Sequence, residues 1–133
     1  MTMKKLFPIV ATLLVLAISG CAPSSPPQET SSTGPDPVVV DPDHYKVEFE
    51  NDRVRVLRIT YCPHEKSVMH EHPGGVAVFL TDSRVKLTFP DGKTEESAEK
   101  AGEAIWLKGE THLPENLSDE PLELILVEMK AYK

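Results

Sequence analysis

Hydrophobic and polar positions alternate over short distances from about residue 45 onward, and no stretch there shows a convincing helical period. Residues 84–89 place Val85, Leu87 and Phe89 on one face of a strand. Residues 75–80 form a short, continuous apolar run typical of a buried strand. The same criteria predict further strands over residues 45–50, 53–61, 104–107 and 122–129. Many short strands separated by Gly, Pro and Asp indicate an all-β sandwich or barrel.

Several connections can also be read from the pattern. Asn51 and Asp52 suit a two-residue hairpin turn. Residues 90–93 suit a turn because proline presets φ and glycine tolerates positive φ. Within residues 53–61 the apolar positions change face, which predicts a β-bulge near Val56 or a strand buried on both faces. Residues 95–100 are the one place where a short helix would fit, and strand plus turn is preferred there.

Residues 1–20 have the pattern of a secretory signal peptide. Two lysines precede an apolar run that is too short to cross about 30 Å of hydrocarbon. Residues 18–21, Ile-Ser-Gly-Cys, resemble the bacterial lipobox, which implies that Cys21 is acylated, by palmitate or similar chains, and becomes a stable membrane anchor. Ala22 follows, where no Asp favours the inner membrane, so an outer-membrane lipoprotein facing the periplasm is expected. The alternative is an ordinary signal peptide with a chance cysteine at the cut.

The mature chain divides into a tether and one domain. Residues 21–37 contain the Cys and a Pro/Ser-rich stretch without large apolar residues, so we expect a disordered tether. Residues 38–133 are enough for a single domain with one core. Loss of the two signal-peptide lysines leaves 12 basic and 21 acidic residues, a formal charge of −9. Such a charge is unsuited to nucleic acid or to anionic membrane surfaces.

His70 and His72 are the first candidates for chemistry. If the chain is extended there, both imidazoles project to the same face about 6.5–7 Å apart along the strand, and Glu71 projects to the other. One ion can then contact both rings. Taken alone the pair is a weak signal, because two surface histidines in a loop would look the same.

A second block, residues 102–116, changes this interpretation. Together the two blocks resemble the two cupin motifs: His70 and His72 match the His-x-His pair, His112 the histidine of the second motif, Asn116 its asparagine and Gly102 its opening glycine. The resemblance covers about residues 45–129 and implies a jelly-roll β-barrel. It also implies that His70, His72 and His112 meet inside the barrel mouth and bind a divalent metal.

The chain departs from the cupin pattern at two places. The expected glutamate ligand would fall at Val76 or Ala77, so any site here has three histidines and no carboxylate. Lys108-Gly109 replaces a Pro-x-Gly turn and is one residue shorter, which puts the placement of His112 in question. Three protein ligands with open positions are typical of catalytic metal. Imidazole suits Fe, Zn, Cu or Ni alike, so the ligands do not select the element. The candidate metals are Fe, Zn, Mn or Ni. A three-histidine ferrous site also resembles that of the thiol dioxygenases.

For most of the other candidate residues, the sequence allows two roles. Glu110 could accept a hydrogen bond from an imidazole or be surface charge. Asn116 is expected to fix a turn rather than to contact substrate. Trp106 could line a pocket, although strand aromatics are usually core. Cys62 is read as a small buried apolar residue, with a soft ligand or redox-active thiol near the metal as the alternative. His44 and His64 are expected to be solvated.

Three functions stay open. The first is an envelope accessory protein that binds a metal and a small molecule. The second is a non-haem metal-dependent dioxygenase acting on a small molecule. The third is an unmetallated barrel with a structural or interaction role. The cupin resemblance also implies a possible homodimer.

Overall fold

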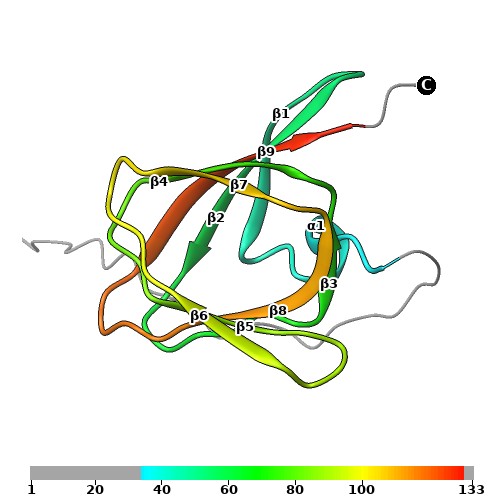
Figure 1. Cartoon of the computed structure of the whole chain (residues 1–133). Coiled ribbons are helices and arrows are strands. Elements are labelled where there is room, and N and C mark those ends of the chain that lie inside the picture. Colours follow the sequence, from blue (N-terminus) through cyan, green and yellow to red (C-terminus); the bar gives the residue numbers. More distant parts are fainter. Residues whose placement is uncertain (1–33, 131–133) are drawn as a thin grey trace, which may run out of the picture.

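The structure, a computed structural model, describes residues 34–130 and contains two antiparallel sheets that face each other (Figure 1). The five-stranded sheet has the spatial order β1 (Tyr45–Glu50), β2 (Val54–Tyr61), β9 (Leu122–Met129), β4 (Gly75–Phe79) and β7 (Ala104–Leu107). The four-stranded sheet has the order β3 (His70–His72), β8 (Glu110–Asn116), β5 (Val85–Thr88) and β6 (Thr94–Ser97). This architecture confirms the expected all-β jelly roll.

Over the described residues the two sheets stay separate and do not join into one continuous hydrogen-bonded barrel. The chain passes from β3 to β4 through Pro73 and Gly74, and from β7 to β8 through Lys108 and Gly109. The two bends touch, because a Cβ on Gly109 would lie 3.1 Å from the backbone nitrogen of Gly74. The short Lys108-Gly109 turn therefore fits this corner and still leads into β8.

The core lies between the sheets. On β9 the inward positions are Leu122, Leu124, Leu126 and Glu128, so three leucines and one carboxylate point the same way. The remaining buried hydrophobic residues are Tyr45, Leu57, Ile59, Tyr61, Ala77, Phe79 and Val85. Burial of this apolar surface is the main stabilising contribution to a small domain of this kind.

The local predictions can be compared with the elements. The bounds predicted for β1, β7 and β9 agree with the structure. The register shift lies between Val47 and Phe49 of β1, opposite Val56, so the bulge is on the partner strand. The hairpin loop has three residues rather than two, and Asn51 Oδ1 accepts hydrogen bonds from the backbone N–H of residues 53 and 54. In the turn at 90–93, Gly92 has φ of 83°, as expected.

Helix α1 (Pro37–Val40) was not predicted, and it is the first helix or strand among the described residues. Asp36 Oδ1 accepts a hydrogen bond from the backbone N–H of Val38, and the carbonyl of Pro35 accepts one from Glu71. The fold therefore begins a few residues before the expected boundary. The signal peptide, Cys21 and most of the expected tether lie outside the described residues. Among residues 34–130, no helix is long and apolar enough to cross a membrane.

Candidate metal centre

Three histidines meet where β3 and β8 run side by side. His70 pairs directly with His112 in the strand register, and His72 lies two residues further along β3. The three residues are only 0%, 4% and 7% exposed for His70, His72 and His112. One ring nitrogen from each lies within 4.8 Å of the others. The structure thus brings together the three predicted residues in positions that can hold a metal ion.

The hydrogen bonds of the first two rings decide which nitrogens are available. His70 Nδ1 lies 2.8 Å from the carbonyl of Val68, which can only accept, so Nδ1 carries the proton. His72 Nδ1 lies 2.6 Å from Glu128 Oε1 and likewise donates. When both rings are neutral, each Nε2 is left with a lone pair, and the two Nε2 atoms are 3.0 Å apart. Two lone pairs at this distance repel unless a cation or a proton lies between them, so the donor set fits a metal ion.

His112 completes the group and has a buried nitrogen without a partner. Its Nδ1 receives no hydrogen bond from the described residues, and Glu110 Oε1 stands 3.5 Å away, too far for a good one. A buried polar atom left this way is costly. Coordination of a metal, or a closer approach of Glu110, would satisfy it.

The site favours neutral imidazoles. Burial, together with the nearby rings of His72 and His112, lowers the pKa of His70 to about 3. Burial, followed by the proximity of His72, lowers the pKa of His112 to about 4, although Glu110 acts in the opposite direction. Both rings are therefore uncharged near neutral pH, as metal binding requires.

Glu128 is a functional residue that the sequence reasoning missed. It lies on β9, is 1% exposed, and accepts hydrogen bonds from His72 and from Arg55 Nε at 2.5 Å. Burial alone would raise the pKa of Glu128, but the bonds from His72 and Arg55 outweigh burial and hold the pKa below its usual value. Arg55 also bonds Asp36 at 2.6 Å, which connects the start of the fold to the site. A carboxylate that fixes a ligating histidine in this way is common behind metal centres.

The cupin pattern has a glutamate that this chain lacks. The buried carboxylate near the histidines here is Glu128, which lies on another strand and hydrogen-bonds His72. β9 runs beside β4, and Glu128 pairs with Gly75. A Cβ at Gly75 would come within 2.2 Å of the Val127 carbonyl oxygen, so glycine is needed for the two strands to approach. Along β9 every second side chain from Leu122 onward points inward, and Glu128 continues this alternation. That alternation in the sequence could have shown that Glu128 is buried.

The other predicted residues have distinct locations. Asn116 is buried and holds a turn: its Nδ2 donates to the carbonyls of Cys62 and Glu120, and its Oδ1 accepts from Ser118. Cys62 follows the end of β2, is half-buried, and is not part of the three-histidine group. Trp106 is 64% exposed on β7 and does not line the cavity, which corrects the pocket interpretation.

Glu110 is half-buried and lies between His112 and Lys108, whose Nζ is 3.3 Å from Glu110 Oε2.

His44 is buried, contrary to the expectation that it is solvated. Its Nδ1 lies 2.7 Å from Asp41 Oδ1, its Nε2 lies 3.0 Å from Glu65 Oε2, and its ring stacks on Tyr61. Burial acts to lower the pKa of His44, but the hydrogen bonds to the two carboxylates outweigh it and raise the pKa. Ser67 bonds Asp41 and lies 3.4 Å from His70 Nδ1. This cluster therefore braces the strand that carries His70 and His72.

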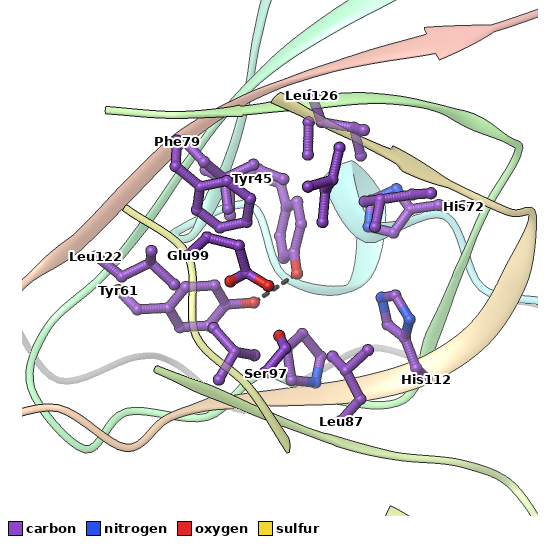
Figure 2. Close-up of a pocket in the computed structure, with 17 residues that line it drawn as sticks. Tyr45, Tyr61, His72, Phe79, Leu87, Ser97, Glu99, His112, Leu122 and Leu126 are labelled. Carbon is purple, nitrogen blue, oxygen red and sulfur yellow. Dashed lines mark hydrogen bonds between the residues drawn. The ribbon is translucent and has the colours of Figure 1, made fainter. Parts of the chain in front are cut away.

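A cavity of about 90 Å³ adjoins the histidines (Figure 2). His72 and His112 form part of its wall, and most of the rest is apolar. The apolar side chains are Ile59, Ala77, Phe79, Val85, Leu87, Ile105, Leu107, Pro114, Leu122, Leu124 and Leu126. The space therefore adjoins the histidines that could hold a metal ion.

Comparisons with known proteins support the fold. No family profile and no curated protein sequence matches the chain. Among solved structures, a cupin domain from Bordetella pertussis Tohama I is 27% identical, with a TM-score of 0.60, covering 65% of this chain and 92% of its own. A double-stranded β-helix protein from Klebsiella pneumoniae is 19% identical, with a TM-score of 0.52 and coverage of 64% and 70%. An RmlC-like cupin from Methanocaldococcus jannaschii is 15% identical, with a TM-score of 0.51 and coverage of 64% and 77%.

The described domain therefore has the cupin fold, and it carries three buried histidines positioned to hold a metal ion.

The role of Glu128 can be tested by Glu128→Gln in the full chain. Loss of the carboxylate weakens the orientation of His72, so we expect Zn²⁺ affinity to fall about 10- to 100-fold in a competition titration with a chelating dye. Glu123→Gln is the matched control, because Glu123 lies on the same strand and pairs with Arg58 away from the site. Equal affinity of the two variants would contradict the assigned role.

The metal-free protein should lose stability in mild acid. The pKa values of His70 and His112 lie near 3 and 4 in the fold against 6.5 in the unfolded chain, so unfolding takes up protons between these values. The stabilising contribution is complete above about pH 6.5 and declines as the pH falls toward 4. We expect the free energy of unfolding to drop by about 2 kcal/mol per pH unit near pH 5, measured by urea denaturation with a chelator present.

In His112→Gln this slope should be roughly halved, because one of the two groups that take up protons is gone. A flat free energy of unfolding between pH 7 and pH 5 in the parent protein would show that these rings are not held neutral by the fold.

Proposed function

We propose that this protein is a lipid-anchored cupin of the bacterial envelope that binds a divalent metal through His70, His72 and His112. In this proposal the adjoining cavity binds a small molecule. The observation that carries the proposal is the 3.0 Å approach of the Nε2 atoms of His70 and His72, each with its Nδ1 proton engaged elsewhere. These two nitrogens, with His112, would hold a divalent ion, whose charge would remove the repulsion between the lone pairs.

The three-histidine set determines the character of the site. Neutral imidazoles do not offset the charge of the ion, so a bound metal would act as a Lewis acid that favours anionic ligands and acidifies bound water. The chain itself contributes positioning: Glu128 and the Val68 carbonyl hold the first two rings, and the β3–β8 pairing holds the third. The apolar wall of the cavity limits the access of water to the same point.

A dioxygenase-like enzyme is the second candidate. It is favoured by a ligand group of three histidines without a carboxylate, next to an apolar cavity that accommodates a small organic molecule. Oxygen uptake by the iron-loaded protein with small thiols or diketones distinguishes it from a binding protein, since a binding protein consumes no oxygen with any of them.

The envelope anchor rests on residues 18–21 and the apolar run before them. If Cys21 is acylated, the full chain expressed in a bacterial host fractionates with the membrane, and Cys21→Ser moves the protein to the soluble periplasmic fraction. Recovery of both forms in the soluble fraction would reject the anchor while leaving the metal site untouched.

The metal proposal is tested by metal analysis of the full chain purified in detergent without added metal, then after incubation with Fe, Mn, Ni or Zn. We expect close to one equivalent of at least one metal. In His112→Ala, occupancy should fall at least about tenfold, because one of three ligands is lost. His64→Ala is the control, since His64 is exposed and bonds only Asp119.

If the parent protein stays empty with all four metals, the proposed metal site is wrong and the unmetallated structural role is favoured instead.

A further inference from the structure

The cavity beside the histidines contains one acidic side chain that the metal site does not use. Glu99 lies in the loop between β6 and β7, lines the cavity, and is only 9% exposed. Figure 2 shows Glu99 and Tyr61 on one side of the cavity and His72 and His112 on the other, with apolar side chains around them. A molecule that fills the cavity would therefore contact Glu99 at one end and the two histidines at the other.

The carboxyl group of Glu99 is fixed in place but incompletely partnered. Ser83 Oγ donates to Oε2 at 2.8 Å, and the Ser83 N–H donates to the Glu99 carbonyl at 2.9 Å. The Glu99 N–H in turn donates to Ser83 Oγ at 3.2 Å. No hydrogen bond from the described residues reaches Oε1. The two loops thus hold the carboxyl group firmly while leaving one oxygen for another donor.

The cavity wall supplies no positive charge to this carboxyl group. Among the described residues that line it there is no Lys or Arg. Tyr45 and Tyr61 share a hydrogen bond between their hydroxyls, and burial raises the pKa of both, so they stay neutral. The carboxyl group has one neutral side-chain donor, and a cation is the partner that binds a carboxylate most strongly. The aromatic rings of Tyr45, Tyr61 and Phe79 in the same wall also favour a cation.

We infer that the cavity binds a small amine whose protonated amino group lies against Glu99 and whose apolar body extends toward the histidines. The inference rests on the proposed function, because it names the chemical class of the molecule that the metal-site cavity takes. The small volume limits the body to a few carbon atoms. An anionic group would be repelled at the Glu99 end, and a neutral alcohol would leave the carboxylate charge unpaired.

The test uses two probes of the same shape, isobutylamine and isobutanol, with the full chain in detergent. Binding is followed by NMR chemical-shift titration near neutral pH, once with a chelator and once with Zn²⁺. We expect isobutylamine to bind at least about tenfold more tightly than isobutanol, since hydrogen bonds to a charged group are stronger than neutral ones. In Glu99→Gln this preference should disappear. Glu95→Gln, which removes an exposed carboxylate on β6, should retain it.

Equal binding of the two probes by the parent protein overturns the inference, and so does an unchanged preference in Glu99→Gln. If Glu99→Gln does not fold, the relative affinity of the parent protein for isobutylamine and isobutanol still tests the inference. The two proposals fail separately. Amine preference without Zn²⁺ binding would reject the metal function and keep the amine site, whereas Zn²⁺ binding without amine preference would reject only the amine site.

Discussion

The contact between the Nε2 atoms of His70 and His72 is the constraint around which this domain is arranged. Two neutral rings cannot share a hydrogen bond there, because both Nδ1 protons are committed to the Val68 carbonyl and to Glu128. The fold maintains the 3.0 Å approach by burying both rings and by packing Tyr45 against them. A cation or a proton between the two nitrogens relieves this repulsion, and a bound cation would link the architecture to the proposed function.

The support for this contact comes from distant parts of the chain. Glu128 on β9 orients His72, Arg55 on β2 holds Glu128, and Asp36 before helix α1 holds Arg55. Each buried charge in this series has a partner of opposite sign, which is the condition under which buried charges are tolerated. The five-stranded sheet therefore positions the histidines that stand on the four-stranded sheet.

The sequence predicted most of the strands and the three histidines because both depend on local patterns: alternation for the strands, and motif spacing for the histidines. It did not predict Glu128, because its relation to His72 depends on β9 lying beside β4 in a register that no short window contains. Strand β8 was also missed, since Pro114 in its interior is unfavourable for a strand. The sequence wrongly predicted an exposed His44, because its burial depends on Asp41 and Glu65, which come together only in the fold.

The account predicts a specific protonation state, which ¹H–¹⁵N correlation spectra of the imidazole rings report directly. In the metal-free protein at neutral pH, His70 and His72 should both carry their proton on Nδ1. Addition of one equivalent of Zn²⁺ should shift the Nε2 signals of both rings while Nδ1 stays protonated. Unchanged Nε2 signals with Zn²⁺, or a proton on Nε2 of both rings in the metal-free protein, would contradict the central claim.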